Sequence, residues 1–375
     1  MRTISQKARG RLAPIGVHWG RQHPRGMNPI PFGSLSSGET VEAHALTNAA
    51  GASAQVLTYG GIVTSLCMPD RLGRMADVVL GYGSLGDYVD GTAYLGAIVG
   101  RVAGRVTGGL IPLEGGTLAL AQNDGANHLH GGRRGLDRRV WGAKPRSLDD
   151  GSASLELTYT SPDGEEGYPG TVEIAVTYTL TAGNALVVES EASSDRATPL
   201  SLAHHSYFNL AGEGSGDIRG HELQVLADDF VPAGAGMALS DRRVPVAGRG
   251  ADFRRARRIG EALPSLTKAH GDLYLLRAAG APRPESPALA ARVHERASGR
   301  VLEVFTDEDC LQFYTGVSLD GARPGKSGRP YGPHAGLCLE CHGYPNATGR
   351  PGFGDILVVP GRPQRRRTVY AFSTT

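Results

Sequence analysis

The chain has 375 residues, including 54 glycines and 23 prolines, and carries a formal charge of +2 at pH 7. This length allows one large domain or two ordinary ones, and the glycine and proline content suits a chain with many tight turns. The nearly balanced charge gives no reason to expect a nucleic-acid or membrane partner, and no apolar run is long enough to span a bilayer.

The first residues of the chain are basic and lack both an apolar signal region and a small-residue cleavage site. We therefore expect residues 1–30 to form a disordered N-terminal extension, and residues 31–375 to form one domain. The missing signal favours a cytoplasmic location, with a periplasmic or secreted protein as the alternative.

Strand patterns dominate the chain that follows. Apolar and polar residues alternate in four segments rich in Val, Ile, Thr and Tyr, which are Thr40–Asn48, Ser154–Thr160, Thr171–Leu180 and Ala185–Ala192. Helical periodicity is fair only in Phe253–Leu263. Many antiparallel strands with few short helices predict an all-β sandwich or barrel.

Arginine clusters at 254–258 and 365–367 are interpreted as solvated faces of this fold. The four cysteines, Cys67, Cys310, Cys338 and Cys341, are too few for a disulfide framework in a chain of this length. If 336–343 is a strand, Cys338 and Cys341 face opposite sides of the sheet, so we interpret them as small buried residues.

Polar residues gather in a few strand or tight-loop segments with apolar neighbours. Period two places His205 and Tyr207 on one face of their segment and His204 on the other. It likewise places Glu340 and His342 together, with leucines behind them. A carboxylate in that setting is either paired structurally or kept for chemistry.

A metal site is one alternative, because His128, His130, His204, His205 and Glu340 could in principle supply ligands. No helical H-E-x-x-H spacing occurs, and the adjacent His204 and His205 cannot bind one ion from a strand. A purely structural role for each histidine is the other alternative.

Three segments in order, "NHLHGG" (127–132), "HHSYFNLAG" (204–212) and "CLECHGYPNA" (338–347), make the chain resemble the aldose 1-epimerase, or galactose mutarotase, family. The resemblance extends from about Pro31 to Phe372. It implies a large antiparallel β-supersandwich. It also implies an isomerase that interconverts the α and β anomers of a free aldose such as glucose or galactose, without metal or organic cofactor.

The resemblance also assigns roles to individual residues. It implies that His205 is the proton donor and Glu340 the general base. The side chains it places against the monosaccharide are Arg105, His130, Tyr207, Asp272 and Gln312. His128 of "NHLHGG" is then interpreted as structural. The resemblance leaves the protein as a monomer or a homodimer.

Three positions depart from the family pattern. Gly104 and His204 each stand where asparagine is usual, and Cys341-His342 stands where Thr-Gln is usual. None removes a proton-transfer residue, but each touches the pocket or its support, so the preferred sugar stays open.

Opening a hemiacetal requires one group to take the C1 hydroxyl proton and another to protonate the ring oxygen. We therefore expect an ionised Glu340 beside a protonated His205, with each favouring the charged form of the other. The main rival is a non-catalytic carbohydrate-binding relative. Two others are a metal-dependent hydrolase or lyase, and an epimerase of sugar phosphates.

Overall fold

The computed structural model of the protein describes residues 28–278, 281 and 284–375. The extension predicted over residues 1–30 therefore falls mainly outside the described residues. The first strand, β1 (Ile30–Ser34), begins at the last residue of that range.

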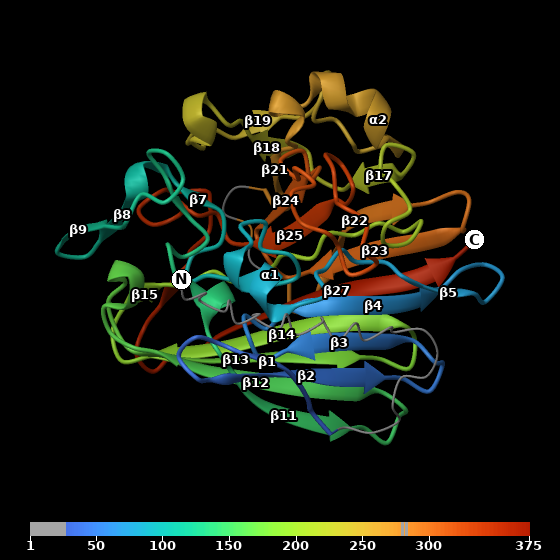
Figure 1. Cartoon of the computed structure of the whole chain (residues 1–375). Helices are drawn as coiled ribbons and strands as arrows, with labels where there is room; N and C mark the ends of the chain where they lie inside the picture. The colour runs from blue at the N-terminus through green and yellow to red at the C-terminus, as the bar shows by residue number, and fades with distance from the viewer. Residues whose placement is uncertain (1–27, 279–280, 282–283) are drawn as a thin grey trace, which may run out of the picture.

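Three antiparallel sheets hold most of the strand residues of the described chain (Figure 1). The largest has, in order, β11 (Gly142–Ser147), β12 (Ala153–Ser161), β13 (Val172–Leu180), β14 (Ala185–Ser194), β27 (Gln364–Thr374), β23 (Arg300–Thr306), β22 (Ala288–His294), β17 (Glu222–Val225) and β20 (Arg257–Arg258). The second joins β1 to β2 (Thr40–Thr47), β3 (Ser53–Leu57), β4 (Val63–Pro69) and β5 (Met75–Asp77). The third has β19 (Val244–Pro245), β18 (Asp229–Val231), β21 (Leu273–Leu275), β24 (Cys310–Tyr314) and β25 (Cys338–His342).

Short elements connect these sheets. The two-stranded pairs are β6 (Ile98–Val99) with β16 (Ala203–His204), β7 (Arg105–Val106) with β10 (His128–Leu129), β8 (Leu110–Leu113) with β9 (Gly116–Ala119), and β15 (Thr198–Pro199) with β26 (Leu357–Val358). The helices of the described chain are α1 (Leu85–Asp90), α2 (Ile259–Ala262) and the 3-10 turns Thr107–Gly109, Leu136–Arg138, Glu165–Gly167, Ala235–Met237, Leu263–Ser265 and Thr267–Ala269. Within these described stretches, no helix combines the length and apolar character needed to cross a bilayer.

One hydrophobic core joins the three sheets. Alternate residues of β2–β4, such as Leu46 and Val56, pack into the same core as Leu157 and Val176 of the large sheet. Leu339 of β25 belongs to that core as well. In Figure 1 the second sheet (blue) lies over β12–β14 (green), and the third lies beyond β27 and β23. The long sheet is thus covered by two shorter ones, which confirms the predicted β-supersandwich.

The four predicted strands are confirmed as β2, β12, β13 and β14, with ends shifted by at most two residues. The helix predicted over Phe253–Leu263 is wrong for most of its length. Arg257 and Arg258 pair with β17 instead, and α2 spans only the four residues from Ile259. Pairing with a sheet edge outweighs a weak local helical preference here.

The arginine clusters lie on exposed or half-buried surface, and several of their members form ion pairs. Arg254 contacts Asp252, and Arg365 contacts Glu191 across β27 and β14. Their interpretation as solvated faces is confirmed.

Candidate functional site

A cavity of about 390 Å³ opens between the third sheet and the loops around β7 and β10. Its volume is in the range of small-molecule sites. The structure brings all seven side chains singled out from the sequence to its wall, namely Arg105, His130, His205, Tyr207, Asp272, Gln312 and Glu340.

Strand β25 places the carboxylate. All five of its residues are buried, and Leu339 and Cys341 pack into the main core. Glu340 and His342 project from the opposite face into the cavity. The predicted alternation along this strand is therefore confirmed, and a core on one side fixes the direction of Glu340 on the other.

His205 is placed by a backbone hydrogen bond, in which its N–H donates to Ala97 O at 2.9 Å. Its ring lines the cavity beside Tyr207, with ring centroids 5.1 Å apart. His204 points the other way and packs edge-on against Tyr178 and Tyr370. The two histidines thus face opposite sides, as predicted.

The proton-transfer candidates meet at the centre of the site. His205 Nε2 lies 3.6 Å from Glu340 Oε2, and the side chains are only 5% and 3% exposed. Glu340 Oε2 has no hydrogen-bond partner among the described residues. The separation is too long for a direct hydrogen bond, so a substrate oxygen can interact with each group separately.

Burial controls the charge of this pair. It lowers the pKa of His205 to about 4 and raises the pKa of Glu340 to about 8, although the nearby Arg105 opposes the second shift. Both shifts favour the neutral forms. Between these values the pair holds one proton, which resides on Glu340. This differs from the charged pair expected from the sequence, because desolvation has a larger effect here than mutual attraction.

The segment "NHLHGG" contains one structural and one cavity histidine. His128 is fully buried; its Nδ1 donates to Ala121 O at 2.7 Å, and its Nε2 accepts from the Tyr168 hydroxyl at 2.7 Å. The structural interpretation of His128 is confirmed. The chain then turns at His130, where φ is +51°. Gly131 is required next, because a Cβ there would lie 1.7 Å from Gly100 O.

The hydrogen bonding of His130 fixes its tautomer. Its Nδ1 accepts from the Gly104 N–H at 3.2 Å, and burial holds its pKa well below the ordinary value. The neutral ring therefore carries its proton on Nε2. His130 can thus donate a hydrogen bond to a sugar oxygen from that nitrogen.

The same observation bears on a metal at this site. The candidate ligand atoms of His130, His205 and Glu340 lie within 4.8 Å of one another. However, one nitrogen of His130 already accepts a backbone N–H and the other carries a hydrogen, so this ring offers no free lone pair for a metal ion. The donor set fits hydrogen bonding and proton transfer better than coordination.

The other predicted side chains are held by neighbouring groups. Arg105 Nε donates to Asp124 Oδ2 at 2.6 Å, Thr267 Oγ1 donates to Asp272 Oδ1 at 3.0 Å, and Gln312 Nε2 donates to Phe313 O at 2.7 Å. Gln312 and Glu340 are direct partners in the pairing of β24 with β25. These contacts leave polar groups of defined orientation around the cavity.

Sequence reasoning did not identify Tyr94 as a residue of the wall. Tyr94 contacts both His130 and His205, with ring centroids 4.8 and 5.9 Å away. His342, which the sequence placed on the face of Glu340, lines the cavity beside Gly104. Cys338 Sγ lies 3.6 Å from His205 Nδ1. Tyr94 lies in a loop at φ +54°, where no periodic pattern could have indicated its direction.

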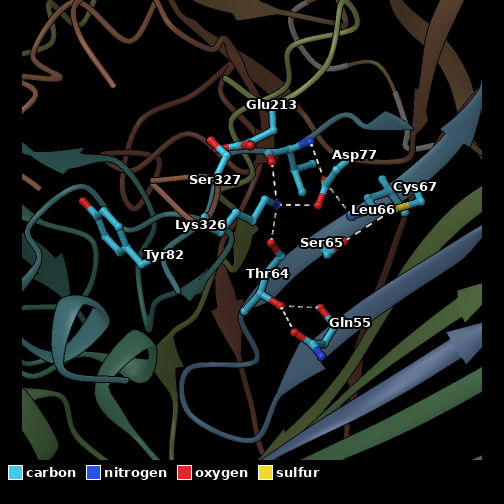
Figure 2. A network of polar contacts seen from close by, with 12 residues as sticks. Gln55, Thr64, Ser65, Leu66, Cys67, Asp77, Tyr82, Glu213, Lys326 and Ser327 are labelled. Atoms are coloured by element: carbon cyan, nitrogen blue, oxygen red, sulfur yellow. Dashed lines mark hydrogen bonds and ion pairs between the residues drawn. The ribbon is translucent and has the colours of Figure 1, made fainter. Parts of the chain in front are cut away.

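The loop between β24 and β25 supplies Val317, Ser318 and Leu319 to the wall. Figure 2 shows how the loop is held further along. Lys326 Nζ reaches Asp77 Oδ2 at 2.6 Å and donates to the Thr64 and Val79 carbonyls. This ammonium group joins the loop to β4 and to the end of β5.

Comparison with known proteins supplies a second line of observation. Residues 42–371 match the sequence family described as aldose 1-epimerase. Galactose mutarotase from pig is 41% identical over 344 residues, covering 91% of this chain and 97% of the relative. Aldose 1-epimerase from Escherichia coli strain K12 is 32% identical over 334 residues, covering 87% and 94%.

Solved structures are similar in fold as well. An aldose epimerase homologue from C. elegans has a TM-score of 0.81 and 27% identity, covering 89% of this chain and 99% of its own. Galactose 1-epimerase from Lactobacillus acidophilus has a TM-score of 0.79 and 28% identity, covering 92% and 98%.

Proposed function

The chain belongs to the aldose 1-epimerase family, and from this premise we propose that its cavity interconverts sugar anomers with His205 as acid and Glu340 as base. The protein is an isomerase, a mutarotase that acts on an aldose. The observation that carries the assignment of residues is the buried pair itself, with Nε2 and Oε2 3.6 Å apart on one cavity. Our first choice of substrate is galactose, with glucose next.

Ring opening requires two proton transfers. Glu340 carboxylate removes the proton of the C1 hydroxyl while His205 Nε2–H protonates the ring oxygen. The bond between C1 and the ring oxygen breaks, and C1 becomes an aldehyde. Rotation about the C1–C2 bond then presents the other face of the aldehyde. Reclosure reverses both transfers, so His205 regains its proton and Glu340 returns to the carboxylate.

The single proton of the pair fits this cycle. Before ring opening, the proton must pass from Glu340 to His205, because the carboxylate has to be free to accept. After ring opening, Glu340 is protonated and His205 is neutral. That is the arrangement which burial favours through the raised pKa of Glu340 and the lowered pKa of His205. The desolvated site therefore stabilises the protonation state that accompanies the open-chain aldehyde.

The remaining groups are proposed to hold the sugar. His130 Nε2–H and the Arg105 guanidinium donate hydrogen bonds, while Asp272 and Gln312 receive or share hydroxyl hydrogens. Tyr207 offers an aromatic ring to the C–H face of the sugar.

An uncharged monosaccharide fits this set better than a sugar phosphate. The guanidinium of Arg105 already pairs with the Asp124 carboxylate, so it is not free to pair with a phosphate. A phosphate would need an additional unpaired cation at the cavity.

Polarimetry of freshly dissolved α-D-galactose, with α-D-glucose beside it, tests the proposal. We expect the protein to accelerate mutarotation, and H205A and E340A each to lose about 10²–10⁴-fold in kcat/KM while keeping their circular dichroism spectrum. H294N, a change at a partly exposed histidine outside the cavity, is the matched control and keeps full activity. Full activity in E340A would falsify the assignment. Galactose binding without acceleration by the unmodified protein would favour the non-catalytic alternative.

A further inference from the structure

His342 is a cavity residue that the proton-transfer scheme does not use. The residue is 1% exposed, and its Nδ1 donates to the Gly343 carbonyl at 2.7 Å. Since a carbonyl can only accept, Nδ1 carries the proton and Nε2 of the neutral ring keeps a lone pair. Among the described residues, Nε2 has no hydrogen-bond partner. A buried acceptor in this condition costs free energy unless a ligand satisfies it.

Gly104 leaves the space that this imidazole ring occupies. Its φ is +78°, and a Cβ there would lie 2.8 Å from Pro345 Cγ and 3.2 Å from His342 Cε1. The positive φ favours glycine, and the close approach leaves little room for a larger side chain. The Gly104 N–H also fixes the tautomer of His130, so one residue supports a donor histidine and makes room for an acceptor histidine.

The position of His342 along β25 indicates which part of a sugar it can reach. His342 and Glu340 lie two residues apart on one face of the strand, which corresponds to about 6.6 Å. With Glu340 at the C1 hydroxyl, His342 lies a distance comparable to the width of a pyranose ring away. A different hydroxyl must then face it.

We propose that His342 Nε2 accepts a hydrogen bond from one sugar hydroxyl other than that at C1, and that Gly104 keeps the place of its ring open. This inference rests on the proposed function and deepens it by naming a specificity-determining contact. A sugar that lacks the hydroxyl leaves the buried acceptor unpaired, so the protein discriminates against that deoxy sugar.

Mutarotation of galactose and its 2-, 3-, 4- and 6-deoxy derivatives tests this contact in the unmodified protein, H342Q and H342F. We expect one deoxy sugar to have a kcat/KM about 10–100-fold below that of galactose in the unmodified protein. H342F keeps a ring of similar shape without an acceptor. In this variant the kcat/KM of galactose divided by that of the same deoxy sugar falls to about one, while the corresponding ratios for the other deoxy sugars stay unchanged. H342Q, which keeps an acceptor oxygen, retains much of the discrimination.

Gly104 provides a second variant that does not alter the imidazole. Asparagine tolerates positive φ better than most residues, so G104N tests the space rather than the backbone. We expect G104N to raise KM about tenfold by displacing His342, and to weaken discrimination against the same deoxy sugar. Discrimination that is the same in H342F as in the unmodified protein, or absent from the unmodified protein, overturns the inference.

These outcomes are separable from failure of the proposed function. If the unmodified protein does not accelerate mutarotation, or E340A stays fully active, the assignment of the reacting pair fails. If the protein is active, E340A is inactive and the effect of H342F is the same on every sugar, only the contact at His342 fails.

Discussion

Replacing Glu340 by glutamine should move activity and stability in opposite directions. E340Q keeps the size of the side chain but removes the proton acceptor, so we expect kcat/KM to fall by about 10²–10⁴-fold. The same change removes a buried group whose ionised form is strongly disfavoured in the folded protein. The folded state should therefore become more stable at neutral pH.

The size of the stability gain follows from the pKa of Glu340. Burial raises this pKa from 4.5 to about 8 in the folded protein. Below pH 4.5 the carboxyl is protonated in both folded and unfolded chains and has no effect. As the pH rises above 4.5, the unfolded chain releases the proton and the folded one keeps it, which destabilises folding by about 1.4 kcal/mol per pH unit up to about pH 8. At pH 7 this amounts to about 3 kcal/mol, or about 4 °C in Tm for a chain of this length.

Differential scanning calorimetry at pH 4 and pH 7, together with polarimetry, measures both effects. E340Q should melt higher than the unmodified protein at pH 7 and at nearly the same temperature at pH 4. E173Q, at an exposed glutamate of β13, should change neither quantity. A Tm of E340Q that is equal to or lower than that of the unmodified protein at pH 7 would refute the reasoning from desolvation.

We expect kcat/KM to be constant between about pH 4 and about pH 8. Below about pH 4, His205 is protonated as well as Glu340; above about pH 8, Glu340 has lost its proton and the pair holds none. A fall centred near pH 6.5 would contradict this. Because the charge of Arg105 lowers both of these pKa values, R105Q should lose activity and also move both limbs of the profile to higher pH, measured on its residual rate. K326M should lower the free energy of unfolding by about 2 kcal/mol in urea titrations, since it leaves a carboxylate and two carbonyls without their cation. Unchanged stability in K326M would show that these contacts contribute nothing net.

The local sequence pattern predicted the positions of strands and the faces on which their side chains lie. Alternation of apolar residues located β2, β12, β13 and β14, because one face of each strand must meet the core. The same period separated His204 from His205 by face. The order of three short segments indicated the family, and with it the residues that meet on one cavity.

Features that depend on tertiary surroundings could not be predicted in this way. The helical pattern of Phe253–Leu263 gave no sign of the sheet edge with which Arg257 pairs. Tyr94 enters the cavity from a loop with positive φ. The protonation of the reacting pair depends on how completely the cavity excludes solvent, and the free nitrogen of His342 depends on the Gly343 carbonyl. None of these has a periodic signature.

Desolvation connects the stability of this protein with its chemistry. A more exposed Glu340 would be ionised at neutral pH and ready to accept a proton, but it would gain less from holding that proton once the ring is open. In the buried pair, the free-energy penalty lies on the charged arrangement that precedes ring opening, and is relieved as the C1 proton reaches the carboxylate. Since this relief comes as the bond breaks, burial favours the open-chain aldehyde over the charged arrangement from which ring opening starts. The stability lost at Glu340 is therefore part of how the site works, and a variant that recovers it should lose activity.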